Sequence, residues 1–296
     1  TNHKDEGMYR SFLKEMKKIN KNIVIGGLTA TGFRLKGGFL HKGKTKLFDD
    51  VCHETTIAEL MNPDHPKNRD KKQYLCPLIS PKKAMKSKVD LSEVHTRMGE
   101  YVSEEMQTAF CKDNLVERSV KEIIEYTVDR NNILVFTAGI KHCDAVVEAF
   151  EKFDQTVGFV HSKRSDIENQ KALSDFKKGN IKYLVNVDKL TTGYNQKNID
   201  CIAVLRSTQS PGLWIQILGR GCRLHPDKEN CLVLDFGGNI DRIGPIDKIE
   251  IKEAKDGSLE VGTMPQKTCP KCESVLFLAV MVCPDCGYEF PVKDKH

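Results

Sequence analysis

The sequence predicts an α/β fold with helices on both faces of a parallel sheet, and two patterns support that prediction. Short apolar runs alternate with helix-like segments over residues of about 115–243, at the spacing of a doubly wound domain. Two C-x-x-C pairs near residue 280 predict a small separate module. Ligands of doubly wound sheets bind beside the carboxyl ends of the strands, so we expect the functional residues there.

Helix start signals and apolar runs order the elements of this segment. Asn114 with Glu117 has the pattern of a capping box, as does Ser165 with Glu168. Ser210 followed by Pro211 predicts another helix, which we expect to continue to about Gly221. A further helix is expected at 143–150, and strands are expected at 133–136, 156–160, 182–187, 199–205 and 231–236.

The N-terminal part is expected to add little core. Met8, Phe12 and Met16 recur at four-residue steps and predict a short amphipathic helix from about Glu6. Residues 22–31, NIVIGGLTAT, form an apolar run typical of a strand. From there to about Asn114 prolines and lysines are frequent, which predicts a linker or insertion with helices.

Composition excludes few functions. The 296 residues suffice for one large or two ordinary domains, and no apolar stretch approaches the roughly 18 to 20 residues that cross a bilayer. The net charge, 46 − 41 = +5, permits a polyanionic partner without requiring one. Eleven cysteines without an export leader favour a reducing cytoplasm. Because the chain starts at Thr1, we expect a fragment of a longer chain.

The strongest local signal is the cysteine pattern near the end of the chain. Two C-x-x-C pairs separated by ten residues place four thiolates on two tight turns, which suits tetrahedral zinc. Four protein ligands leave no open position, so the predicted zinc is structural and would have to fold a segment with almost no core of its own. The four predicted ligands are Cys269, Cys272, Cys283 and Cys286. The other seven cysteines lie singly in apolar or linker contexts and are expected to be small hydrophobes.

Residues 38–45, GFLHKGKT, match the P-loop pattern G-x-x-x-x-G-K-T literally. A working P-loop needs a buried strand leading into its first glycine and a helix after its lysine. The preceding residues 32–37, GFRLKG, are not a buried strand. We therefore interpret the segment as a loop rich in glycine and lysine.

The pair Arg220 and Arg223 is the strongest candidate for a catalytic role. Their three-residue spacing would place both guanidinium groups on one face of the helix that starts at Ser210, where they could bind one anion of several oxygens, such as a triphosphate. Surface arginines of a helix can also serve solubility alone, so the neighbouring motifs decide between the two interpretations.

Four segments in a fixed order carry a family resemblance. They are Thr29-Ala30-Thr31, residues 133–139 (ILVFTAG), residues 184–195 (LVNVDKLTTGYN) and residues 216–223 (QILGRGCR). These segments resemble motifs III, IV, V and VI of superfamily 2 helicases of the DEAD/DEAH type. Together with the cysteine module, they resemble the RadD-type group of DNA-repair helicases. The resemblance covers residues of about 20–240.

The resemblance implies a RecA-like sheet domain at 115–245 that follows the tail of a first RecA-like lobe at 1–35 and a linker or insertion at 36–114. A zinc ribbon would occupy 264–292. ATP with Mg²⁺ would bind between the lobes of the intact enzyme, and Arg220 and Arg223 would stabilise the transferring phosphoryl group. Cleft contacts would come from Gln216, Gly219, Gly193 and Asn195, and nucleic-acid contacts or coupling from Thr29, Thr31, Thr137, Thr191 and Thr192.

Two positions depart from the family pattern, because Gly32 stands where proline is usual and Asn195 where aspartate is usual. A larger departure is that the sequence shows no credible Walker A loop and no DEAH box. We therefore expect the C-terminal portion of an ATP-dependent DNA helicase or translocase that is inactive alone. A separate N-terminal half could supply the missing motifs. The alternatives are a non-catalytic module that binds nucleic acid or protein, and the motor subunit of a restriction enzyme. Whether the zinc ribbon would contact DNA or protein is open.

Overall fold

The computed structural model divides the chain into two compact units, Thr1–Glu54 with Ile251–Glu260, and Thr55–Glu250 with Val261–His296. It describes residues 8–34, 38–42, 46–81, 83, 85–97, 99–190, 194–253, 259–262, 266–272, 274–277, 280–283 and 285–291. Across these ranges no helix has the length and apolar character to span a membrane.

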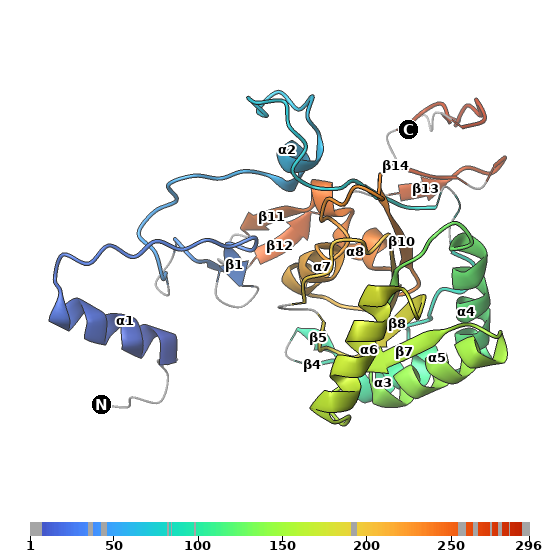
Figure 1. Cartoon of the computed structure of the whole chain (residues 1–296). Helices are drawn as coiled ribbons and strands as arrows, with labels where there is room; N and C mark the ends of the chain where they lie inside the picture. The colour runs from blue at the N-terminus through green and yellow to red at the C-terminus, as the bar shows by residue number, and fades with distance from the viewer. Residues whose placement is uncertain are drawn as a thin grey trace. The chain divides into compact units, whose positions relative to one another are not determined.

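A six-stranded sheet forms the centre of the second unit, in the order β3-β10-β9-β6-β8-β7, and every neighbouring pair is parallel. Figure 1 labels β10, β8 and β7 of this sheet. The strands run over Leu78–Ile79 (β3), Ile133–Thr137 (β6), Val157–Val160 (β7), Tyr183–Asn186 (β8), Cys201–Leu205 (β9) and Cys231–Asp235 (β10). All carboxyl ends of a parallel sheet lie along one edge, here called the carboxyl edge, and all amino ends along the opposite amino edge.

Helices cover both faces of this sheet. Ile133 and Val135 belong to a buried cluster that includes residues of α3 (Ser103–Phe110), α4 (Leu115–Tyr126) and α5 (Ile140–Lys152). The alternate residues Leu134 and Phe136 are also buried but lie outside this cluster, on the opposite face. Buried side chains of α6 (Asp166–Lys178) and α7 (Pro211–Leu218) lie outside it too. The predicted parallel sheet with helices on both faces is confirmed.

The five predicted strands of the sheet all form, but the strand expected at 22–31 does not. Residues 22–31 contain no strand, and Val24 is 92% exposed. An apolar run without a neighbouring strand has no partner for its backbone N–H and C=O groups. Conversely, β3 comes from the part expected to be a linker and adds the sixth strand beside β10. Two residues are too short to show a periodicity in the sequence.

Of the two predicted capping boxes, the one at Ser165 forms and the one at Asn114 does not. The Ser165 hydroxyl accepts a hydrogen bond from the Glu168 backbone N–H at 3.3 Å, and the Glu168 carboxylate accepts one from the Ser165 N–H at 3.0 Å, as predicted. Asn114 instead adopts a left-handed conformation with φ of 55° and makes no side-chain cap bond. The capping box predicted for Asn114 and Glu117 is therefore wrong, because an N-cap side chain reaches the helix only from an extended backbone.

Short elements complete the structure. The first unit contains α1 (Met8–Ile19) and an antiparallel pair, β1 (Phe33–Arg34) with β2 (Gly38–Phe39). The second unit contains α2 (Ile57–Met61), the hairpin of β4 (Thr96–Arg97) and β5 (Glu100–Tyr101), α8 (Asn239–Ile243), a 3₁₀ turn at Ile246–Lys248, and the pair β13 (Gln266–Thr268) and β14 (Val275–Phe277). Strands β11 (Glu250–Glu253) and β12 (Leu259–Gly262) pair with each other.

Candidate functional site

The arginine pair lies in a turn rather than on a helix. Helix α7 ends at Leu218 with Gly219 as its C-cap, so Arg220 and Arg223 belong to the turn that follows, residues 219–223, here called the arginine turn. The prediction that they share a helical face is therefore wrong. The two side chains nevertheless have one common target.

That target is the backbone carbonyl oxygen of Tyr194, in the loop of residues 187–200 that connects β8 to β9. Arg220 donates to it through Nη1 at 2.6 Å and Arg223 through Nη1 at 2.9 Å. Arg220 is only 8% exposed and Arg223 is half-buried. Burial lowers the pKa of both guanidinium groups, and the neighbouring charge of Arg223 lowers the pKa of Arg220 further. Two cations held this close favour an anion beside them.

Tyr194 is itself held firmly within the β8–β9 loop. Its hydroxyl donates to the side chain of Gln196, whose Nε2 lies 3.5 Å from the Asn132 side-chain oxygen. Burial raises the pKa of the Tyr194 phenol to about 12, so it remains a protonated donor at neutral pH. The carbonyl acceptor of the two arginines is thus fixed by contacts on its own residue and its neighbours.

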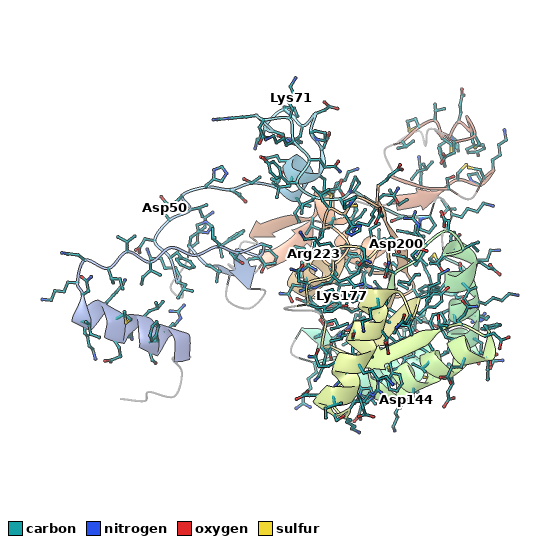
Figure 2. All side chains as sticks on the ribbon, in the orientation of Figure 1. Asp50, Lys71, Asp144, Lys177, Asp200 and Arg223 are labelled. Carbon is teal, nitrogen blue, oxygen red and sulfur yellow. The ribbon has the colours of Figure 1, made fainter. Side chains whose placement is uncertain are left out.

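These contacts place the arginine turn at the amino edge of the sheet. Asn132 immediately precedes β6, and a side chain on Gly221 would lie 2.4 Å from Sγ of Cys231, the first residue of β10. In Figure 2, Arg223 and Asp200 are labelled well above Asp144, which lies on the helix that follows the carboxyl end of β6. The expectation that the arginines lie at the carboxyl edge is wrong, because α7 leads the chain back along the sheet after β9.

The remaining predicted cleft residues differ in their position along the chain relative to the arginine turn. Asn195 is exposed and adjoins the shared acceptor Tyr194. Gln216 is exposed on α7, two residues before its last residue, and Gly219 caps that helix. Gly193 and two predicted coupling residues, Thr191 and Thr192, lie outside the described residues.

The other predicted nucleic-acid residues lie in separate places. In the first unit, the Thr29 hydroxyl accepts from the Thr31 N–H at 3.0 Å and donates to the Thr31 carbonyl oxygen at 3.1 Å, which closes a tight local turn. In the second unit, Thr137 ends β6 at the carboxyl edge and is fully buried. Its hydroxyl donates to the carbonyl oxygen of Asn186 at 3.2 Å, so it links β6 to β8.

The carboxyl edge carries a polar network that sequence reasoning missed. The buried Asp235 carboxylate accepts from Nδ2 of Asn239 at 2.8 Å and from the backbone N–H of Ile240 at 2.7 Å. Burial raises the pKa of Asp235, while these hydrogen bonds act in the opposite direction. Glu100 accepts from the Thr208 hydroxyl at 2.5 Å and from the Gln209 N–H at 2.9 Å. This hydrogen bonding fastens the β4–β5 hairpin to the segment after β9.

The segment that matches the P-loop pattern begins in an antiparallel pair. Gly38 and Phe39 form β2, which pairs with β1 at Phe33 and Arg34. Residues 43–45 lie outside the described residues. The described part therefore has the antiparallel pairing of a hairpin, whereas a P-loop follows a strand of a parallel sheet.

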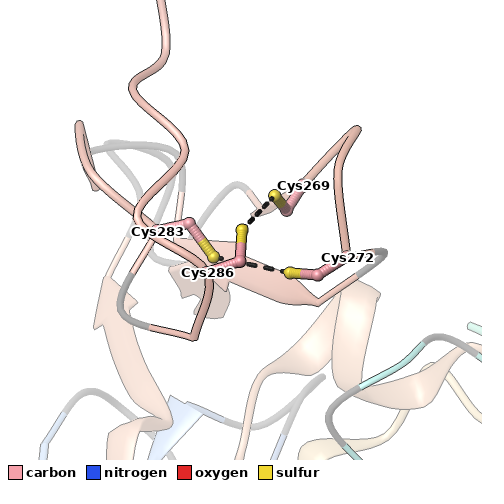
Figure 3. Close-up of side chains that lie close together, drawn as sticks. All are labelled: Cys269, Cys272, Cys283 and Cys286. Atoms are coloured by element: carbon pink, nitrogen blue, oxygen red, sulfur yellow. Dashed lines mark hydrogen bonds between the residues drawn. The ribbon is translucent and has the colours of Figure 1, made fainter.

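The four predicted metal ligands converge in the structure (Figure 3). The thiol sulfurs of Cys269, Cys272, Cys283 and Cys286 all lie within 4.8 Å of one another, and two pairs are 3.6 Å apart. Four sulfurs about 2.3 Å from a central ion would be roughly 3.8 Å apart in a tetrahedron. The cluster therefore has the size that a metal ion requires and could hold one.

Backbone hydrogen bonds fix both cysteine turns. The Cys269 N–H donates to the Ser274 carbonyl oxygen and the Cys283 N–H to that of Tyr288, each at 2.8 Å. The Ser274 side chain lowers the pKa of Cys272 to about 6, which favours the thiolate that binds metal. The Tyr288 N–H favours the Cys286 thiolate, but burial and the adjacent thiols together raise the pKa of Cys286 to about 12. A cation would displace the shared protons.

Five of the other seven cysteines are buried, as suits small hydrophobic residues. Cys52 and Cys111 are exposed. The five buried thiols are Cys76, Cys143, Cys201, Cys222 and Cys231.

Comparison with known families identifies the sheet domain. Residues 116–225 match the model of the helicase conserved C-terminal domain, and this range includes both arginines and the whole β8–β9 loop. The sheet domain thus matches the helicase conserved C-terminal domain, and the predicted likeness to the C-terminal part of superfamily 2 helicases is confirmed.

Curated relatives agree with this class. Irc3 of Schizosaccharomyces pombe, whose name describes a mitochondrial ATP-dependent helicase, is 30% identical over 236 residues, which cover 78% of this chain and 35% of that protein. IRC3 of Saccharomyces cerevisiae, named as an ATP-dependent helicase, is 26% identical over 240 residues, covering 80% of this chain and 33% of that protein. The chain spans about a third of the length of these relatives.

One of the solved structures that resemble part of the chain is a restriction-enzyme fragment. A fragment described as an HsdR subunit of a type I restriction enzyme from Vibrio vulnificus YJ016 is 19% identical and covers 56% of this chain and 33% of its own, with a TM-score of 0.43. A likeness this weak does not favour that alternative over the helicase assignment.

Proposed function

We propose that this chain supplies the second motor lobe of an ATP-dependent DNA helicase or translocase, with Arg220 and Arg223 acting on the triphosphate. The observation that carries the proposal is the convergence of both guanidinium groups on one carbonyl oxygen, at 2.6 and 2.9 Å, inside the helicase domain. Guanidinium donors held in fixed positions stabilise the charge of a transferring phosphoryl group, and Mg²⁺ bound with ATP would neutralise part of it.

The β8–β9 loop supports a coupling role in this proposal. It leaves the carboxyl edge after Asn186 and returns to the amino edge before Cys201. Its middle carries Tyr194, which binds both arginines. A shift of nucleic acid at the carboxyl edge could thus be transmitted along the loop to the arginines. In this proposal the nucleic acid is DNA, contacted mainly through phosphates, which gives little sequence preference and strong salt dependence.

The chain alone is proposed to be inactive, because phosphoryl transfer also requires a phosphate-binding lysine and Mg²⁺ ligands. The test expresses the reading frame upstream of Thr1, either fused to this chain or as a second polypeptide, and measures ATP hydrolysis with and without single-stranded and duplex DNA. We expect DNA-stimulated hydrolysis by the combination and none by the chain alone.

Three results would change the proposal. Hydrolysis by the chain alone that Lys44→Ala abolishes would restore the P-loop interpretation. A combination that binds DNA but does not hydrolyse ATP would favour a non-catalytic binding module. Stimulation by RNA but not DNA would keep the motor and change its substrate.

We propose that the four-cysteine cluster holds structural Zn²⁺, since four thiolates are the usual ligands of structural zinc. The test measures the zinc content of the purified chain and hydrogen exchange of residues 266–291 before and after chelation. We expect one zinc per chain, and loss of exchange protection in this segment but not in the sheet after chelation. The variant Cys283→Ser should behave like the chelated chain, and Cys52→Ser, at an exposed cysteine, like the untreated one. Unchanged protection after complete zinc removal would reject the structural role.

A further inference from the structure

Lys228 is a buried lysine whose ammonium group binds three backbone carbonyl oxygens. Its Nζ lies 2.8 Å from the oxygen of Ile199, 2.9 Å from that of Gly221 and 3.1 Å from that of Lys197. Lys228 is 9% exposed. Because an ammonium group has three N–H donors, these three acceptors satisfy all of them.

The three acceptors belong to the two segments that build the arginine site. Lys197 and Ile199 lie in the β8–β9 loop, a few residues after the shared acceptor Tyr194. Gly221 lies in the arginine turn, between the two arginines. A single side chain therefore joins the segment that carries the guanidinium donors to the segment that carries their acceptor.

The buried charge of Lys228 favours the arrangement in which the arginine turn and the β8–β9 loop stay together. A buried ammonium is costly unless all its donors are bonded, and here its acceptors are neutral carbonyls. Separation of the turn from the loop would leave the charge with a missing acceptor, so the ammonium favours the assembled arrangement. The opposite side of the turn is also fixed, since the Cys76 N–H donates to the Cys222 carbonyl oxygen at 2.6 Å.

Gly221 permits this arrangement. A side chain there would lie 2.4 Å from Sγ of Cys231 and 3.0 Å from Cδ1 of Ile202, so only glycine lets the turn approach the starts of β9 and β10 this closely. The carbonyl oxygen of Gly221 then accepts a hydrogen bond from Lys228. The described hydrogen bonds of the two guanidinium groups go instead to the carbonyl oxygen of Tyr194.

We propose that Lys228 is a positioning residue of the arginine site, which fixes the arginine turn on the β8–β9 loop through its three carbonyl contacts. This inference rests on the proposed function only for its effect on ATP hydrolysis. The positioning itself concerns this chain alone and is measured separately.

The first measurement is hydrogen exchange of the whole 296-residue chain. Lys228→Met keeps the aliphatic stem but removes the donors. We expect the amides of residues 194–200 and 219–224 to exchange about tenfold faster or more, because hydrogen bonds from charged donors restrain local opening. Lys177→Met, which changes an exposed lysine of α6 outside this contact, should exchange like the wild type. Wild-type exchange in Lys228→Met would overturn the proposal.

The second measurement distinguishes hydrogen bonding from packing and serves also where Lys228→Met folds poorly. In Lys228→Ala, ethylammonium should restore slow exchange of residues 219–224, because it brings N–H donors into the space left by the side chain. Tetramethylammonium has the same charge and no N–H donor, so it should not. Equal restoration by both cations, or by neither, would contradict the assigned role of the three donors.

The third measurement uses the combination with the N-terminal half. We expect Lys228→Met to lower kcat for ATP about 100-fold with little change in KM, because misplaced arginines fail mainly in the transition state. Faster exchange with wild-type kcat would show that the contact does not position the arginines. No hydrolysis by the wild-type combination would count against the proposed function, and the exchange measurements would still decide the role of Lys228.

Discussion

The two edges of the six-stranded sheet differ in which charged side chains hold their loops in place. At the amino edge the hydrogen bonds of the cations end on backbone carbonyl oxygens, as those of Lys228, Arg220 and Arg223 do. At the carboxyl edge, carboxylates accept from backbone N–H groups and neutral side chains, as Asp235 and Glu100 do. The amino edge also holds the Asp200 carboxylate, which accepts from the N–H groups of Asn131 and Asn132. The carboxyl edge also contains the ion pair of Arg206 and Asp188.

This difference suggests that the two edges of the sheet have different functions. An edge rich in cations bound to carbonyls attracts a polyanion such as a triphosphate. The carboxyl edge is a rigid network that fixes the loops leaving the strands, including the β4–β5 hairpin and the start of the β8–β9 loop. Variants at the two edges should therefore have different consequences, which the following predictions test.

The largest effect is expected at the amino edge. Arg220→Ala and Arg223→Ala should each lower the kcat for ATP hydrolysis of the combination with the N-terminal half by about 10³-fold or more. Nucleic-acid affinity, measured by fluorescence anisotropy, should change little, because neither residue lies at the carboxyl edge. Arg69→Ala, at an exposed arginine, is the matched control. Equal losses of affinity and kcat would remove the distinction between the edges.

The next effect concerns the stability of the carboxyl edge. Asp235→Ala would leave the donors of Gly237, Asn239 and Ile240 without their carboxylate acceptor. Several buried donors without acceptors should cost about 3 kcal/mol of unfolding free energy or more. Urea unfolding followed by circular dichroism measures this change.

A matched control lies six residues further along the chain. Asp241 is exposed and pairs with Lys88 at 2.6 Å. Asp241→Ala should cost less than about 1 kcal/mol, as exposed ion pairs usually do. Similar losses in Asp235→Ala and Asp241→Ala would show that the carboxyl-edge network is not a special source of stability.

The sequence predicts the sheet far better than it predicts its edges. Apolar runs such as 133–136 and 201–205 reveal buried strands because burial on both faces requires continuous apolarity. No comparable pattern marks Lys228, which lies in the polar segment HPDKEN and looks like a surface residue. Its burial depends on three carbonyls brought together only by the fold. The arginine pair could be predicted by family resemblance. The edge of the sheet at which the pair lies, however, depends on where α7 ends.

The cysteine cluster is the opposite case. Its spacing alone predicted the four cysteines that converge, since a C-x-x-C turn brings two sulfurs close together whatever the rest of the chain does. The Ser165 cap was equally local, whereas Asn114 failed because its left-handed backbone depends on the turn before it. Local chemistry is thus readable from sequence, and contacts between distant segments are not.

A pH effect is expected at the carboxyl edge from His142. It lies in the first turn of α5, where Nδ1 accepts from the Ala138 N–H, and burial lowers its pKa from 6.5 to about 3. Between pH 6.5 and 3 the unfolded chain therefore binds more protons than the folded one. Stability from this group is complete above pH 6.5 and falls by about 1.4 kcal/mol per pH unit below it.

Urea unfolding at several pH values between 7 and 5 checks this expectation. His142→Gln removes the titrating group and should flatten the dependence of unfolding free energy on pH. His95→Gln changes an exposed histidine and should leave the slope as it is in the wild type. A slope that persists in His142→Gln would assign the acid sensitivity to other groups.

The smallest effect is expected where the β8–β9 loop leaves the carboxyl edge. Asp188 pairs with Arg206, but its side chain is 67% exposed, so Asp188→Asn should cost no more than about 1 kcal/mol. Asp188 also has a left-handed backbone with φ of 54°, which asparagine tolerates and alanine does not. Asp188→Ala should therefore cost about 1 kcal/mol more than Asp188→Asn in urea unfolding. Equal costs would mean that the charge of Asp188, rather than its backbone conformation, is what the start of the loop needs.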